Sequence, residues 1–147
     1  MANAERFMQQ YLEIWPSFDA DRLEEAGYSE ATIHHSGMET PIRGAEEPDY
    51  VRAIKALMPD ISLEVANWAA NNDVVFVEYE VSGTLAGRPL SWTGIGRFKL
   101  RGGRMIDAIG RWDNLELLAQ IDPTVRTTAF AETAASLVEK AEVEAKT

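Results

Sequence analysis

The chain has 147 residues, a net charge of −10 and no cysteine. Its length suits one domain with a sizeable core, and its acidity makes nucleic acid and anionic membrane surfaces unexpected partners. The absence of cysteine excludes disulfides, thiolate nucleophiles and thiolate metal sites, and it fits a cytoplasmic location. We expect no signal peptide, and no apolar run approaches the length of a membrane-spanning helix.

The N-terminal part of the chain predicts two helices. Residues 4–15 have the apolar spacing of an amphipathic helix, which Pro16 ends. The apolar face of this helix would consist of Phe7, Tyr11 and Ile14, flanked by Met8, Leu12 and Trp15. A shorter helix follows in residues 20–28, where Asp19 or Asp21 would cap the first turn.

A short strand and a third helix come next. Residues 30–36 predict a strand that carries both histidines of the chain. Because side chains alternate along a strand, His35 would share an inward face with Ile33, and His34 would face outward. The helix that follows ends before Pro59. Its buried stripe would consist of Tyr50, Ile54 and Leu57.

After Pro59 the apolar pattern changes to the period of two that is typical of strands. We expect an antiparallel meander of four strands, at residues 61–70, 74–83, 91–100 and 104–113. One face of the second strand would carry Val75, Val77, Tyr79 and Val81, and one face of the third would carry Trp92, Phe98 and Leu100. A helical turn at 114–121 would close the domain.

Helices followed by strands predict an α+β fold. We expect a cone-shaped barrel, in which a curved mixed sheet, mostly antiparallel, wraps around the N-terminal helices. The domain would span residues 1–122. Residues 123–147 are rich in Ala and Glu and would form an extra C-terminal helix, laid on the domain or on a partner.

Two stretches of the chain carry a family resemblance. The stretch GGRMIDAIGRWDNLELLAQI resembles the closing signature of SnoaL-like polyketide cyclases, and ALMPDISLEV is similar to the entry into their first long strand. The spacing from helix tyrosine to strand to glycine in residues 9–44 resembles that of ketosteroid isomerases. The resemblance covers residues 4–122 and implies the cone-shaped fold of the nuclear transport factor 2-like superfamily, with a small-molecule pocket.

The resemblance also implies roles for individual residues. Tyr11 falls where ketosteroid isomerases have an oxyanion-stabilising tyrosine, and His35 falls where they have the aspartate base. Gly96 stands in place of their second oxyanion donor and also in place of the histidine of SnoaL-like cyclases. Asp113 falls at the acid/base aspartate of those cyclases. The chain therefore departs from both catalytic patterns.

The residue types independently favour acid–base chemistry. An imidazole exchanges protons near neutral pH, so His35 is the expected base, unless it is a core histidine bonded to a neighbour. Asp113, with Arg111, would protonate or orient the substrate, or Asp113 would simply cap the next helical turn. Tyr11 would donate to a substrate oxygen or serve as a core aromatic. The expected substrate contacts are Trp15, Tyr79, Trp92 and Phe98.

The expected function is that of a cofactor-free isomerase, aldol cyclase or lyase acting on a hydrophobic, aromatic or polycyclic small molecule. No phosphate loop, dinucleotide fingerprint or nucleophile elbow occurs, and adjacent histidines on opposite faces make a poor metal site. The alternatives are a non-catalytic binding or dimerising module and, ranked lower, an epoxide hydrolase based on Arg111 and Asp113. A homodimer is expected through the outer sheet face, with Val74, Phe76 and Trp112.

Overall fold

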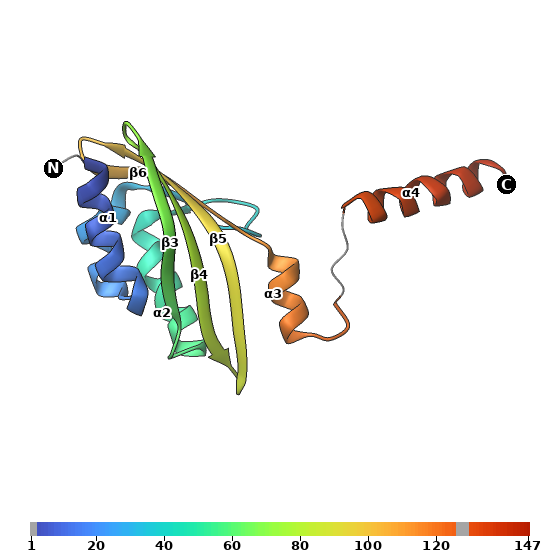
Figure 1. The fold of residues 1–147 in the computed structure, drawn as a ribbon, viewed down its shortest axis with the longest axis horizontal. Coiled ribbons are helices and arrows are strands. Elements are labelled where there is room, and N and C mark those ends of the chain that lie inside the picture. Colours follow the sequence, from blue (N-terminus) through green and yellow to red (C-terminus); the bar gives the residue numbers. More distant parts are fainter. Residues whose placement is uncertain (1–2, 126–129) are drawn as a thin grey trace.

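The computed structural model describes residues 3–125 and 130–147 of the chain. It confirms the α+β class, with a curved six-stranded sheet and helices packed on one face of it (Figure 1). The strands are β1 (Thr32–His34), β2 (Ile42–Arg43), β3 (Ser62–Asn71), β4 (Val74–Leu85), β5 (Arg88–Arg101) and β6 (Arg104–Trp112). The helices are α1 (Asn3–Ile14), α2 (Glu47–Leu57), α3 (Asn114–Ile121) and α4 (Phe130–Ala145). Short 3-10 helices connect them, at Trp15–Ser17, Ala20–Ala26, Tyr28–Glu30 and Gly44–Glu46.

The sheet is mixed and open. Its strand order is β2-β1-β6-β5-β4-β3, so β2 and β3 are its two edges. The pairing of β1 with β6 is parallel, and the other four pairings are antiparallel. The parallel contact brings the first strand of the domain beside the last one. The segment with the two histidines therefore lies next to the end of the meander.

The predicted alternation in the meander is confirmed. On β4 the side chains of Val75, Val77, Tyr79 and Val81 are buried, whereas Glu78 and Glu80 are exposed. The register pairs Trp92 with Val81 and Phe98 with Val75, so the inner face continues onto β5. Both strands are longer than the predicted 74–83 and 91–100, because they continue up to a two-residue turn. That turn is Ala86-Gly87, and both residues have positive φ.

Two apolar residues that were predicted on or beside a buried helix face are exposed. Leu12 is 46% exposed on α1, and Leu57 is 65% exposed on α2. On α2 the buried stripe contains Val51 in place of Leu57. Glu47, the first residue of the helix, also lies on this buried stripe. The sequence also missed the short edge strand β2.

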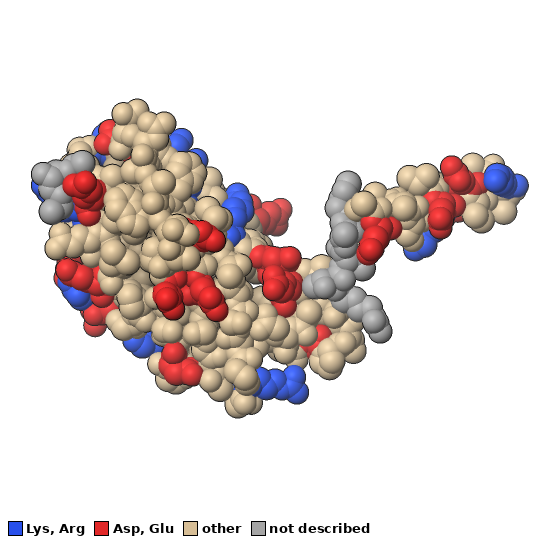
Figure 2. Space-filling model, viewed as in Figure 1, with Lys and Arg blue, Asp and Glu red and all other residues tan. Residues whose placement is uncertain are grey.

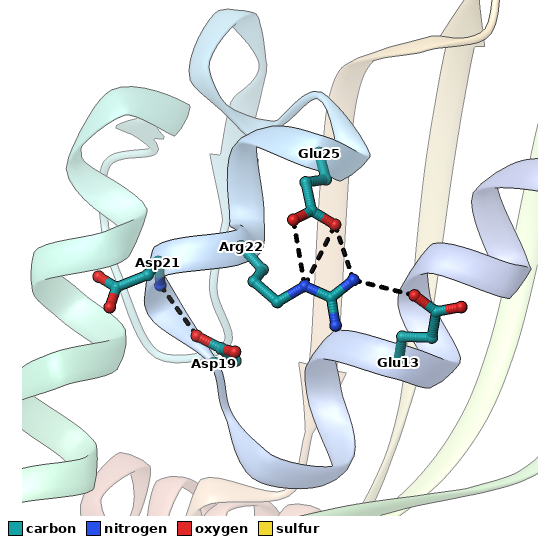
Figure 3. A network of polar contacts seen from close by, with 5 residues as sticks. All are labelled: Glu13, Asp19, Asp21, Arg22 and Glu25. Carbon is teal, nitrogen blue, oxygen red and sulfur yellow. Dashed lines mark hydrogen bonds and ion pairs between the residues drawn. The ribbon is translucent and has the colours of Figure 1, made fainter.

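A polar cluster holds the second helical segment against α1 (Figure 3). The Arg22 guanidinium bonds Glu25 at 2.8 Å and Glu13 of α1 at 2.9 Å. Asp19 caps this segment, as expected, by accepting from the backbone N–H of Asp21. The cluster is exposed, and its stabilising effect is correspondingly small. The turn between the two segments carries Trp15 and Phe18, whose side chains are buried and whose ring centroids lie 5.1 Å apart.

The C-terminal helix α4 lies apart from the rest of the domain, on the far side of α3 (Figure 1). The apolar side chains of Leu137, Val138 and Val143 are exposed along it. A helix was expected here, but the structure does not lay it on the domain. Among the described helices, none is long and apolar enough to cross a bilayer.

The surface combines scattered charges with uncharged areas (Figure 2). On the outer sheet face, Phe76 and Ile95 are 46% and 49% exposed. Trp112 was expected on that face, but this was wrong, because Trp112 pairs with Gly94 on the inner side and lines a cavity there. The apolar part of the outer face thus centres on β4 and β5.

Candidate active site

A cavity of about 310 Å³ lies between the helices and the inner face of the sheet. Its walls come from every layer of the domain: α1 supplies Tyr11, α2 supplies Tyr50, and the sheet supplies Tyr79 and Trp92. Asn114 and Leu117 of α3 complete the lining. Most of the lining side chains are aromatic or aliphatic, which is typical of a pocket for a small organic molecule.

Three glycines make room for aromatic rings at this face of the sheet. A Cβ atom at Gly94 would lie 2.6 Å from the ring of Tyr79, and one at Gly96 would lie 2.8 Å from the ring of Phe98. A Cβ atom at Gly110 would approach the ring of Trp112 to 3.0 Å. At Gly96, where the resembling families are expected to have a polar side chain, the ring of Phe98 therefore occupies the space that a side chain would need.

The polar centre of the cavity is a pair formed by His35 and Glu47. His35 Nε2 lies 2.8 Å from Glu47 Oε2, and the two side chains are 12% and 1% exposed. His35 comes directly after β1, and Glu47 begins α2, so the pair joins the sheet to the helical layer. A buried charge is costly without a partner, so the imidazole is what makes burial of the Glu47 side chain tolerable.

The imidazole of His35 contacts two aromatic rings. The ring of Tyr50 stacks on it at a centroid distance of 4.4 Å, and Trp112 lies tilted at 5.9 Å. The hydroxyl of the next residue, Ser36, donates to the backbone carbonyl of Trp112 at 2.7 Å. These contacts fix the loop after β1 against β6, and with it the orientation of the imidazole.

Four tyrosines line the same cavity: Tyr11, Tyr28, Tyr50 and Tyr79. The Tyr28 hydroxyl accepts a hydrogen bond from the indole N–H of Trp15 at 2.9 Å. Burial raises the pKa of Tyr11 and of Tyr28 well above the ordinary value, and it raises the pKa of Tyr79 to about 12. Burial, and then the nearby Glu47, raise the pKa of Tyr50. At neutral pH all four are hydrogen-bond donors.

The structure brings six of the predicted site residues to this cavity: His35, Tyr11, Trp15, Tyr79, Trp92 and Phe98. It does not bring Arg111 or Asp113 there. The Asp113 carboxylate is exposed and accepts from the N–H groups of Leu115 and Glu116 at 2.9 and 3.0 Å, which is the helix-capping alternative.

The reason is the orientation of β6. Ala108, Gly110 and Trp112 line the cavity, and Arg111 pairs with Ile95 on the outer side. Of the two roles expected for Asp113, the structure therefore shows the helix cap, away from the cavity. The arginine and aspartate expected for epoxide hydrolysis are not assembled at this cavity.

His34 lies on the opposite face of the sheet from His35. Its Nε2 is 3.2 Å from Asp107 Oδ1, and the same aspartate pairs with Arg97 on the adjacent strand. The alternation predicted for the two histidines therefore holds. Among the residues that the structure describes, no group of three or more His, Asp or Glu side chains converges as a metal site would require.

The sequence analysis missed Glu47. A signal was present, because Glu47 lies three and seven positions before Tyr50 and Ile54, on the same stripe of a helix. A glutamate followed by Pro48 fits a helical first turn, and that pattern is usually attributed to exposed charges at the helix N-terminus. The spacing does not reveal that this first turn packs against the loop after β1, where Glu47 contacts His35.

Three solved structures of similar fold can be compared with this chain. IdmH, a candidate polyketide cyclase from Streptomyces antibioticus, is 23% identical, with a TM-score of 0.70 over 80% of this chain and 97% of that one. AclR, a candidate hydroxylase from Streptomyces galilaeus, is 17% identical, with a TM-score of 0.70 over 99% and 98%. An LEH-like epoxide hydrolase of M. tuberculosis is 16% identical, with a TM-score of 0.66 over 80% and 88%.

These identities support the fold and not a shared reaction. Among curated proteins, no match to the chain was found. Residues 8–108 match the family described as the SnoaL-like domain, and this segment runs from α1 into β6, through His35 and Glu47. By this match, and by the sheet and cavity described above, the chain belongs to the SnoaL-like domain family.

Proposed function

We propose that this protein is a cofactor-free acid–base enzyme of the isomerase, aldol cyclase or lyase type, acting on a hydrophobic small molecule. The observation that carries the proposal is the 2.8 Å contact of His35 with the buried Glu47 at the wall of an aromatic cavity. Membership of the SnoaL-like family, and the likeness in fold to a candidate polyketide cyclase, support a ring-forming or ring-rearranging reaction.

His35 would be the base, and Glu47 would orient it. With Glu47 as a carboxylate, which only accepts hydrogen bonds, Nε2 of the imidazole would donate in this contact and Nδ1 would be left to take a proton. When Nδ1 takes a proton from a substrate carbon or hydroxyl, the imidazole becomes positive. The Glu47 carboxylate then stabilises that charge in a site with little water, where such an interaction is strong.

A tyrosine hydroxyl would bind the oxygen on which negative charge develops. Tyr11 and Tyr79 both line the cavity, and the raised pKa of each keeps its hydroxyl protonated at neutral pH. A donor that is already oriented in a desolvated site stabilises an enolate-like oxygen without reorganisation. Proton removal by His35 and charge stabilisation by a tyrosine are together sufficient for isomerisation or aldol closure.

The test is proton exchange at a carbon acid, which does not require the natural substrate. A two-ring ketone such as 2-tetralone is incubated with the protein in D₂O, and loss of its α-proton signals is followed by NMR. We expect His35→Gln to reduce the catalysed exchange by about 10²–10⁴-fold, because glutamine retains a donor for Glu47 but has no basic nitrogen. His34→Ala, on the outer face, is the matched control and should retain the rate. If His35→Gln catalysed the exchange at the wild-type rate, the assignment of His35 as the base would be disproved.

A non-catalytic binding module is the second candidate. It is favoured by the lining itself, where His35 and Glu47 are the only charged or readily protonated groups among the described residues, apart from tyrosines. This alternative predicts that the ketone binds to the wild-type protein and to His35→Gln with similar affinity, while neither accelerates exchange above the rate in buffer.

A further inference from the structure

The cavity offers no positive side chain to a ligand. Among the described residues that line it there is no lysine and no arginine. Its one acidic group, Glu47, is 1% exposed and bonded to His35. With Glu47 as a carboxylate, the net charge of the His35–Glu47 pair is −1 or zero, and in neither state is it positive. An anionic group on a ligand would therefore lose its hydration without gaining a cationic partner.

The basic residues of the β5–β6 region point away from this cavity. Arg97, Lys99 and Arg111 alternate with the inward-facing residues and lie on the outer side of the sheet. Arg97 is bonded there to Asp107. The sheet thus separates these three cations from the ligand site.

The volume of the cavity limits the size of the ligand. A dry apolar cavity of about 150 Å³ is known to hold one benzene molecule. The 310 Å³ found here is about twice that volume, which corresponds to two fused rings. Flat rings of Tyr50, Tyr79 and Trp92 are among the lining, and aromatic faces favour a planar ligand.

We propose that the site selects an uncharged, planar substrate of about two fused rings, with a carbonyl or hydroxyl group, and discriminates against the same skeleton carrying a carboxylate, sulfate or phosphate. This inference rests on the proposed use of the cavity as the substrate site.

The first experiment measures binding by calorimetry at pH 7 for two probes of equal ring size, 2-naphthol and 2-naphthoate. At this pH the hydroxyl of the first is neutral and the carboxyl of the second is ionised. We expect 2-naphthol to bind at least about tenfold more tightly, because burying an unpaired charge is costly. Equal affinity, or tighter binding of 2-naphthoate, would overturn the proposal. The four-ring 1-hydroxypyrene should bind more weakly than 2-naphthol, and tighter binding would refute the size limit.

The second experiment tests the source of the discrimination. Glu47→Gln retains the shape of the side chain and a hydrogen-bonding oxygen for His35, but removes the negative charge. We expect the preference for 2-naphthol over 2-naphthoate to narrow by about fivefold or more in this variant, because the charge repulsion on the carboxylate of 2-naphthoate is lost. An equal change for both probes would contradict the role of Glu47. If the variant does not fold, the wild-type comparison still decides the proposal.

The selectivity and the proposed reaction fail separately. Suppose that the protein catalyses proton exchange of 2-tetralone, that His35→Gln abolishes it, and that the two naphthalene probes bind equally. The acid–base function then stands, and the proposed substrate class is refuted. If 2-naphthol is preferred but no exchange occurs, the cavity selects neutral ligands as a binding module and the proposed chemistry is wrong.

Discussion

Removing the imidazole of His35 should destabilise the fold as well as the proposed chemistry. In His35→Ala the carboxylate of Glu47 loses its hydrogen-bond partner, while its side chain stays enclosed at 1% exposure. The ring that stacks on Tyr50 at 4.4 Å is lost as well. An isolated buried charge is among the few single changes that cost several kcal/mol.

The expected magnitude follows from the burial of the two partners. Breaking a buried ion pair by deleting one member costs roughly 3–5 kcal/mol. Because His35 is itself 12% exposed and water can enter the vacated space, we expect about 3 kcal/mol, at the lower end of that range. His35→Gln restores a donor to Glu47 and should cost only about 1 kcal/mol.

The assay is urea unfolding at pH 7, followed by tryptophan fluorescence. His34→Ala is the control, since His34 is 36% exposed and its pair with Asp107 lies on the outer face. It should cost less than about 1 kcal/mol, as exposed pairs do. If His35→Ala were no less stable than His34→Ala, Glu47 would not depend on His35 for its burial, and the argument for a functional pair would fail.

Three further outcomes are expected. The folded-state pKa of Tyr79, about 12, exceeds the ordinary value of 10.0, so the stability contributed by this shift is present below pH 10 and is lost as pH rises toward 12. The free energy of unfolding should fall by about 2–3 kcal/mol from this source, and Tyr79→Phe should show a smaller fall when unfolding is measured between pH 9 and 12. We propose a homodimer through the outer sheet face, so Phe76→Glu should give the monomer mass by light scattering at micromolar concentration, where the wild type gives twice that mass; a monomeric wild type would refute it. A chain truncated after Pro123 should retain a cooperative thermal transition, because α4 lies apart from the domain; failure to fold would show that the tail is integral.

Local patterns in the sequence determined most of the fold. The alternation of Val75, Val77 and Tyr79 predicted the buried face of β4, and the spacing of Phe7 and Tyr11 predicted that of α1. These predictions hold because the side-chain periods of strand and helix are properties of the backbone. The same alternation separated His35 from His34. The sequence could therefore predict which histidine faces the cavity, although the catalytic role of His35 stays a prediction.

Which face of β6 turns inward was not decided by local pattern. Ile109 and Arg111 alternate with Ala108 and Gly110, and neither set is clearly more apolar. The choice depends on pairing, because β6 lies between β1 and β5 and must present small residues where the rings of Tyr79 and Phe98 occupy the cavity. With β6 in this orientation, Trp112 faces inward and Asp113 is an exposed helix cap.

The partner of His35 was decided only by the tertiary structure. Glu47 is twelve residues away, across a loop, a two-residue strand and a turn. Its burial depends on the parallel pairing of β1 with β6 and on the first turn of α2 lying under the loop after β1. A periodic pattern records which side of an element is apolar. It does not record which charged group the other elements will enclose, because that depends on long-range packing, and here packing put a carboxylate against an imidazole.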